Sequence, residues 1–217
     1  MTLEEHHLQV PRTARYYTVG DPRSAKSIWL VLHGYGQLAR FFLNAFAAQA
    51  EEHHVVAPEG LSRFYLDADH QRVGATWMTR EDRENEILDQ VAYLDRLVTL
   101  LRTEMPALPV HVLGFSQGVA TMGRWLALGR TRPVHALVWG GSLPPELTTE
   151  KLRSAFNGMR VDLVHGLRDE LVPEAQFRSN EERLVRAEVP VTTHVFPGGH
   201  KLDPVILDRC MNAAPLT

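Results

Sequence analysis

The sequence predicts a single α/β domain, in which a mostly parallel central sheet carries helices on both faces. Short apolar runs typical of buried strands alternate with longer segments whose apolar residues recur at helical spacing. Alternation of this kind favours parallel strands that are joined by crossover helices. The length of 217 residues suits one domain, and no repeat, linker or long lid insertion divides residues 1–217.

Six apolar runs are predicted to form the parallel strands. They cover residues 27–32, 54–57, 110–115, 134–139, 161–165 and 191–196. The first run contains no charged residue, as expected for a strand that is buried on both faces, and Pro58 stops the second. Residues 16–19 are expected to form an antiparallel edge strand against the run that begins at Ser27, through a turn at residues 20–22.

The clearest helix is predicted over residues 81–104. Ile87, Val91 and Leu94 begin an apolar stripe with steps of four and three. Acidic residues in the first turns favour the helix dipole, and Pro106 follows the predicted end. Further helices are predicted over residues 38–51, 117–129, 150–156, 173–187 and 204–212.

Two other segments carry local signals. Asp203 is expected to cap the last helix, because Pro204 suits the first helical position directly after it. Residues 59–81 show no convincing period and are interpreted as a long functional loop, since long loops within compact domains are often binding elements.

The composition is that of a globular protein. Apolar residues make up 44% and charged residues 23%, which excludes a mainly disordered chain. The formal net charge is −3 without a basic block, so nucleic acid is not an expected partner. Cys210 is the single cysteine, which excludes a disulfide within the chain and a cysteine-based zinc cluster. We expect Cys210 to be a small buried residue on the last helix.

The sequence predicts a cytoplasmic protein. Glu4, Glu5, His6 and His7 stand where a signal peptide would need an apolar run. No stretch of about 18 predominantly apolar residues is present, so stable membrane insertion is not expected.

The stretch Gly114-Phe115-Ser116-Gln117-Gly118 matches the Gly-x-Ser-x-Gly pattern of a nucleophilic serine, between a predicted strand and a predicted helix. A sharp turn there would strain the serine backbone and lift its Oγ above the sheet. The two glycines leave room for strand and helix to approach each other. The backbone N–H of Gln117 would then face a developing oxyanion. A tight glycine turn with an exposed serine is the alternative, and the strand–turn–helix context favours the nucleophile.

An acid and a histidine follow Ser116 in the order that α/β-hydrolases use. Asp169 and His200 each come in the loop after a predicted strand. Asp169 could instead form a turn or cap a helix, Glu170 is an adjacent carboxylate, and His200 could be an exposed loop histidine. Their positions favour a triad of Ser116, Asp169 and His200.

The loop after the first parallel strand, residues 33–37, reads His-Gly-Tyr-Gly-Gln. α/β-Hydrolases take a second oxyanion donor from this place. Two glycines would let the backbone turn its N–H groups inward, so Tyr35 is the expected donor beside Gln117. Taken alone, the loop could be an ordinary glycine turn.

These motifs resemble those of the phospholipase/carboxylesterase group of α/β-hydrolases, which includes the acyl-protein thioesterases. The resemblance spans residues 27–212 and rests on Leu32-His-Gly-Tyr-Gly, Gly114-Phe-Ser-Gln-Gly-Val-Ala, His165-Gly-Leu-Arg-Asp-Glu-Leu-Val-Pro and Pro197-Gly-Gly-His. It implies an α/β-hydrolase fold and hydrolysis of an ester or thioester without metal or cofactor. It also implies the triad above and an oxyanion hole from the backbone of Tyr35 and Gln117.

Two departures from the family pattern lie where substrate is expected. Gln37 stands where similar proteins carry Asp. Residues 74–82 stand where similar proteins carry an acid-rich motif that contains Pro and Trp. Trp77, Met78 and Phe41 are predicted substrate contacts, and packing in the core is the favoured alternative for several of these side chains. A short or medium acyl chain is expected if Trp77 and Met78 line the mouth of the site.

The expected protein is a serine hydrolase that cleaves esters or thioesters of small to medium acyl groups through an acyl-serine. Two alternatives stay open, an acyltransferase with the same intermediate and a ligand-binding scaffold without catalysis. The expected partner is a small acyl ester or thioester. Arg63 and Arg80 are candidates for attracting an anionic group, but solvated side chains are the favoured interpretation of both. A homodimer is compatible with the sequence.

Overall fold

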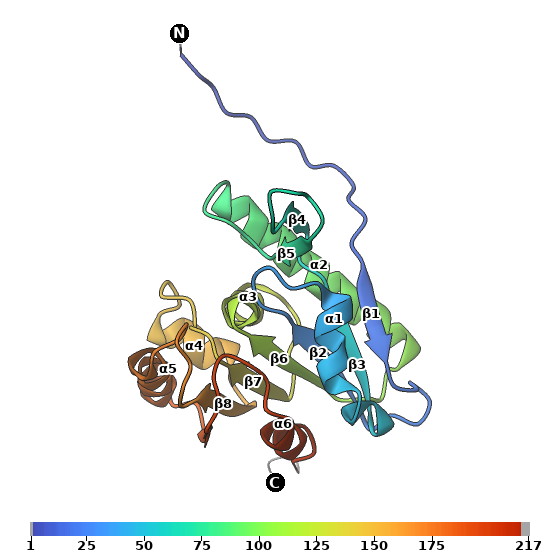
Figure 1. The fold of residues 1–217 in the computed structure, drawn as a ribbon, viewed down its shortest axis with the longest axis vertical. Coiled ribbons are helices and arrows are strands. Elements are labelled where there is room, and N and C mark those ends of the chain that lie inside the picture. The colour runs from blue at the N-terminus through green and yellow to red at the C-terminus, as the bar shows by residue number, and fades with distance from the viewer. Residues whose placement is uncertain (1, 214–217) are drawn as a thin grey trace.

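The computed structural model describes residues 2–213, built on a seven-stranded sheet in the order β1-β3-β2-β6-β7-β8-β9 (Figure 1). The strands are β1 (Tyr16–Val19), β2 (Ser27–Leu32), β3 (His53–Pro58), β6 (Val110–Phe115), β7 (His135–Trp139), β8 (Arg160–Gly166) and β9 (Val191–Phe196). The strands from β3 to β9 in this order run parallel. The predicted mostly parallel sheet is therefore confirmed.

β1 is the antiparallel edge strand, but its partner differs from the predicted one. It pairs with β3, in a register that places Tyr16 opposite Pro58 and Val19 opposite Val55. β2 lies between β3 and β6 and is parallel to both, so it has no free edge for β1. The prediction that β1 pairs with the run from Ser27 is wrong for this reason.

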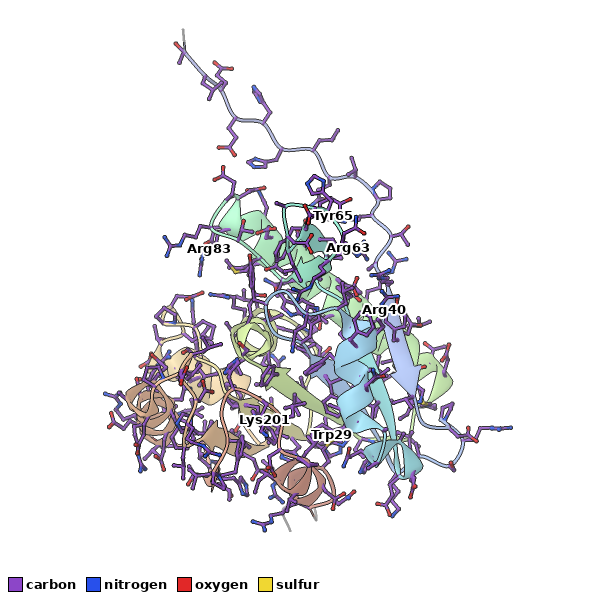
Figure 2. The ribbon with its side chains drawn as sticks, in the orientation of Figure 1. Trp29, Arg40, Arg63, Tyr65, Arg83 and Lys201 are labelled. Atoms are coloured by element: carbon purple, nitrogen blue, oxygen red, sulfur yellow. The ribbon has the colours of Figure 1, made fainter. Side chains whose placement is uncertain are left out.

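Helices cover both faces of the sheet, as predicted. They are α1 (Ala39–Phe42), α2 (Arg83–Glu104), α3 (Gln117–Leu128), α4 (Thr149–Ala155), α5 (Glu174–Arg186) and α6 (Pro204–Met211). α2, α3, α4 and α5 pack with Leu30 and Val112 on one face. α1 and α6 pack on the other face with Trp29, which Figure 2 labels. Within residues 2–213, no helix is long and apolar enough to cross a membrane.

Residues 38–51 do not form the single helix that was predicted. The short α1 is followed by two 3₁₀ turns that end at Glu51. Leu43, Phe46 and Gln49 are the buried residues of these turns, and they recur at steps of three. This spacing matches the three residues per turn of a 3₁₀ helix, so the tighter form buries one face continuously.

Residues 59–81 contain a small antiparallel hairpin instead of only a loop. Its strands are β4 (Ser62–Tyr65) and β5 (Val73–Thr76), and α2 begins after it at Arg83. Each strand has four residues, which is too short for a clear alternation of apolar and polar side chains. The hairpin stands apart from the main sheet, above α1 and α3 in the view of Figure 1.

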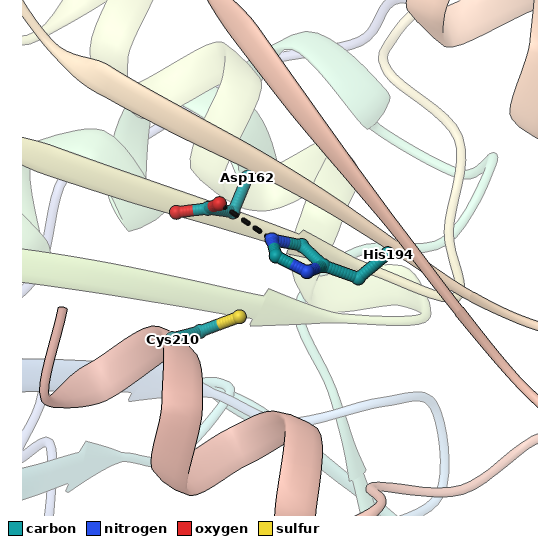
Figure 3. Close-up of side chains that lie close together, drawn as sticks. All are labelled: Asp162, His194 and Cys210. Carbon is teal, nitrogen blue, oxygen red and sulfur yellow. Dashed lines mark hydrogen bonds and ion pairs between the residues drawn. The ribbon is translucent and has the colours of Figure 1, made fainter.

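A buried carboxylate joins three strands of the sheet. Asp162 on β8 is fully buried, and its Oδ2 accepts hydrogen bonds from His135 Nε2 at 2.6 Å and Arg160 Nε at 2.7 Å. Its Oδ1 accepts from His194 Nε2 at 2.7 Å (Figure 3). Burial alone would raise the pKa of Asp162, but the hydrogen bonds outweigh burial and hold that pKa far below its usual range.

Cys210 of α6 lies beside this carboxylate, and its position raises the question of a metal site. The ligand atoms of Asp162, His194 and Cys210 lie within 4.8 Å of one another (Figure 3). Both carboxylate oxygens, however, already accept hydrogen bonds, and the guanidinium of Arg160 would repel a cation. Burial raises the pKa of the Cys210 thiol to about 12, which keeps it protonated. The cluster is therefore explained as a structural ion-pair network.

Replacing Asp162 by Asn should lower the free energy of unfolding by about 3 kcal/mol, because Arg160 loses its buried partner. The folded pKa of Asp162 is depressed, so its contribution is fully present above the unfolded value of about 3.9. That contribution is lost as the pH falls through the lower folded value. Urea unfolding between pH 7 and pH 3 measures the effect of the substitution and the first part of this loss, which begins below the unfolded value. Asp89→Asn, at an exposed position on α2, should leave the free energy nearly unchanged; equal behaviour of the two variants would contradict this account.

Candidate active site

Ser116 occupies the turn between β6 and α3 with φ +54° and ψ −118°, a strained backbone for a residue with a side chain. Its N–H donates to Trp139 O at 2.9 Å, which anchors the turn to β7. A Cβ added to Gly114 would lie 2.6 Å from Gly118 O, and one added to Gly118 would lie 2.1 Å from Leu32 O. Strand and helix therefore approach so closely that only glycine fits at either position.

His200 and Asp169 meet in the loops that follow β9 and β8. His200 Nδ1 lies 2.8 Å from Asp169 Oδ2. A carboxylate only accepts, so Nδ1 carries the proton and Nε2 is left as an acceptor. Asp169 Oδ1 accepts from the N–H groups of Leu171 and Val172 at 3.0 and 2.9 Å. The neighbouring Glu170 is exposed, so Asp169 is the carboxylate that the fold brings to His200.

These two residues lie close to the serine turn. The position of a Cβ on Gly140 is 3.4 Å from Asp169 Oδ2 and 3.6 Å from His200 Nδ1. The ring of Phe115, which directly precedes Ser116, has its centroid 4.9 Å from that of His200. The carboxyl ends of β6, β7, β8 and β9 thus bring Ser116, Asp169 and His200 into one cluster.

The loop after β2 lies against the serine and is held on both sides. Gln37 Oε1 accepts from the N–H of Gly34 at 2.8 Å, and Gly36 N–H donates to Ala75 O on β5 at 2.9 Å. A Cβ on Gly34 would lie 3.1 Å from Ser116 Cβ. Gln37, which departs from the family pattern, therefore stabilises the loop through a hydrogen bond within it.

Tyr35 and Gln117 are the predicted oxyanion donors. Among residues 2–213, the N–H of Tyr35 has no acceptor within hydrogen-bond distance. Gln117 is the first residue of α3, where a backbone N–H has no partner within the helix. Gln117 directly follows Ser116, and Tyr35 follows Gly34, whose Cβ position lies 3.1 Å from Ser116 Cβ, so both N–H groups remain candidates for the oxyanion hole.

His33 is a buried support of this loop that was not identified from the sequence. Its Nδ1 donates to Gly34 O at 2.7 Å, and its Nε2 accepts from the N–H of Gly60 at 3.0 Å. Burial lowers the pKa of His33, which keeps the ring neutral. The carbonyl of His33 accepts from Trp77 Nε1 at 2.9 Å. Trp77 is only 2% exposed, so it supports the loop from the core, which is the alternative to a substrate contact.

The side chain of Gln117 ties α3 to the end of β5. Its Oε1 accepts from Trp77 N–H at 3.2 Å, and its Nε2 donates to Thr76 Oγ1 at 2.8 Å and Met78 O at 3.0 Å. Met78 is half-buried and packs against the core. Of the three predicted substrate contacts, Phe41 alone has a widely exposed side chain. The motif could not reveal the Gln117 contacts because they depend on the undetected hairpin.

Arg63, a predicted anchor for an anionic group, is already paired. Its Nε lies 2.7 Å from Oε1 of the buried Glu59, and Arg15 Nε lies 2.6 Å from the same oxygen. Glu59 Oε2 accepts from Ala39 N–H at 3.2 Å. Burial alone would raise the pKa of Glu59, but its hydrogen bonds and the arginine charges lower it overall. Arg80, the second predicted anchor, is exposed.

The sheet order, the serine turn and the His200–Asp169 pair define an α/β-hydrolase. The chain matches the family model described as Phospholipase/Carboxylesterase over residues 17–213. It therefore belongs to this family, and it is a hydrolase of the esterase or thioesterase type. This confirms the family that the sequence motifs indicated. No curated protein matches the sequence.

Solved structures agree with this fold. A carboxylesterase from Mesorhizobium loti superimposes with a TM-score of 0.73 at 18% identity, over 93% of this chain and 95% of that one. Acyl-protein thioesterase 2 from Zea mays gives 0.68 at 19% identity, over 91% and 96%. A Bacillus cereus carboxylesterase gives 0.67 at 16% identity, over 90% and 91%. At such identities the likeness shows the α/β-hydrolase fold.

Replacing Gln37 by Ala should lower kcat for ester hydrolysis by about tenfold, because the loop that carries Tyr35 loses its internal brace. Gln176→Ala, on the surface of α5, serves as the matched control and should keep full activity. Steady-state kinetics together with the melting temperature separate a local effect from unfolding. Wild-type kcat in a folded Gln37→Ala variant would show that the brace does not position the loop.

Proposed function

We propose that this chain hydrolyses carboxylic esters or thioesters of small to medium acyl groups through an acyl-serine intermediate. The observation that carries the proposal is the 2.8 Å contact of His200 Nδ1 with Asp169 Oδ2, next to the strained turn of Ser116. This pair leaves Nε2 of His200 as the base for the serine hydroxyl.

In the first half of the reaction, Ser116 Oγ attacks the acyl carbon while its proton passes to His200 Nε2. The oxyanion that forms accepts hydrogen bonds from the N–H groups of Tyr35 and Gln117. Collapse of this intermediate breaks the bond to the alkoxide or thiolate, which takes the proton from Nε2. The acyl group is then bound to Ser116, and Asp169 stabilises the transient imidazolium.

In the second half, water gives a proton to His200 Nε2 and attacks the acyl-serine carbon. The same two backbone donors stabilise the second oxyanion. The free acid then leaves, and Ser116 Oγ regains its proton from Nε2. A small or medium acyl group suits this site, because residues 2–213 contain no long insertion to form a lid and Tyr35 and Phe41 are 61% and 60% exposed.

Replacing Ser116 by Ala should lower kcat for 4-nitrophenyl butyrate by about 10⁵-fold or more, because no covalent intermediate can form. Ser154→Ala, at an exposed position on α4, is the matched control and should retain wild-type kcat. Circular dichroism checks that both variants are folded. Substantial turnover by folded Ser116→Ala would refute the acyl-serine route.

The neighbouring acids Asp169 and Glu170 offer a second test. Asp169→Asn should lower kcat by about 10⁴-fold, because the amide no longer holds the imidazole in its productive tautomer. Glu170→Gln should change kcat by less than about twofold, because Glu170 is exposed. The comparison is made on 4-nitrophenyl butyrate at pH 8. An equal loss in both variants would remove Asp169 from its proposed role.

A further inference from the structure

We propose that a groove beside the oxyanion loop binds an anionic group of the substrate through Arg40 and Arg72. This inference rests on the proposed function and names the substrate class, an ester that carries a carboxylate away from the scissile bond.

The groove has a volume of 510 Å³ and lies between α1 and the segment that joins β4 to β5. This volume falls within the range of about 300–1,000 Å³ that is typical of small-molecule sites. Leu38 and Phe42 are buried and form an apolar floor, whereas Arg40 and Arg72 are exposed at its rim. An apolar floor with a charged rim suits a short carbon chain that ends in an anion.

The groove begins close to the predicted nucleophile. Gln37 lines it, and Gln37 Oε1 lies 2.8 Å from the N–H of Gly34. A Cβ on Gly34 would in turn lie 3.1 Å from Ser116 Cβ. The loop that carries Tyr35 therefore contacts both the serine turn and the groove, and the proposal places the scissile carbonyl at Ser116 and the anionic group on the other side of this loop.

Within the described residues, no carboxylate pairs with the guanidinium of Arg40 or Arg72. Arg15 and Arg63, by contrast, both bind Glu59. The guanidinium carbon of Arg40 lies 4.4 Å from the ring centroid of Phe41, which also lines the groove. Figure 2 shows Arg40 on α1, on the same side of the molecule as Arg63 of the hairpin. Two unpaired cations at one groove favour an anionic ligand.

Asp67 is an acid on the segment between β4 and β5, and within the described residues its carboxylate forms no salt bridge with Arg40 or Arg72. Asp67 Oδ1 accepts from the backbone N–H groups of Gln71 and Arg72 at 2.9 and 3.3 Å. The carboxylate thus holds the turn, and the guanidinium of Arg72 stays available. Guanidinium groups bind carboxylates through two parallel N–H donors, which gives them specificity for this group.

The experiment compares anionic esters with neutral esters of matched size. Mono-(4-nitrophenyl) glutarate against 4-nitrophenyl pentanoate places the carboxylate on the acyl side. 4-Acetoxybenzoate against its methyl ester places it on the leaving-group side. The wild-type enzyme should prefer the anionic ester in one arm by about tenfold or more in kcat/KM, as expected for a charge-assisted hydrogen bond.

The double variant Arg40→Gln/Arg72→Gln should lower this anionic-to-neutral ratio by about tenfold or more. Arg80→Gln, an exposed arginine outside the groove, should keep the ratio. If the double variant does not fold, the wild-type enzyme still gives a test. Its preference should fall as sodium chloride rises from about 20 to about 500 mM, because salt screens exposed charges.

The outcomes separate the two proposals. Hydrolysis of neutral esters without preference in either arm, or a ratio that ignores both salt and the double variant, would overturn the anionic groove alone. Failure of the folded wild-type enzyme to hydrolyse any of these esters, anionic or neutral, would overturn the proposed function, and this inference with it.

Discussion

The turn at Ser116 is the constraint on which the rest of the site depends. A residue with φ +54° and ψ −118° is held there only because its surroundings leave no alternative. The hydrogen bond from its N–H to Trp139 fixes it to β7, and the contacts at Gly114 and Gly118 press α3 against β6 and β2. The strain lifts the side chain above the edge where the loops after β2, β8 and β9 converge.

Buried polar groups hold these loops in place, each with its hydrogen bonds satisfied. His33 forms hydrogen bonds that stabilise the loop after β2, and Glu59 forms ion pairs with Arg15 and Arg63. Away from the serine, Asp162 joins β7, β8 and β9 through hydrogen bonds from His135, Arg160 and His194. Satisfied networks of this kind favour one arrangement of a buried region, because any partial loss leaves a charge without a partner. The candidate active site therefore rests on a rigid frame.

Much of this arrangement could be predicted from the sequence, because its signals are local. The glycines around Ser116 lie two residues from it, and Asp169 and His200 come shortly after predicted strands. The partner of β1 could not be predicted, because it depends on the order of the strands in the sheet, and no local sequence pattern indicates that order. The hairpin at 59–81 was missed because its strands are short. The contacts of the Gln117 side chain and the groove at Arg72 depend on this hairpin, so they could not be predicted from the sequence.

The central claim is that Ser116 is an activated nucleophile, and covalent labelling tests it most directly. The folded protein is treated with a fluorophosphonate probe, and peptide mass spectrometry locates the adduct. The account predicts one adduct, on Ser116, that disappears in Ser116→Ala. A folded wild-type protein that stays unlabelled, or that is labelled at another serine, would contradict it.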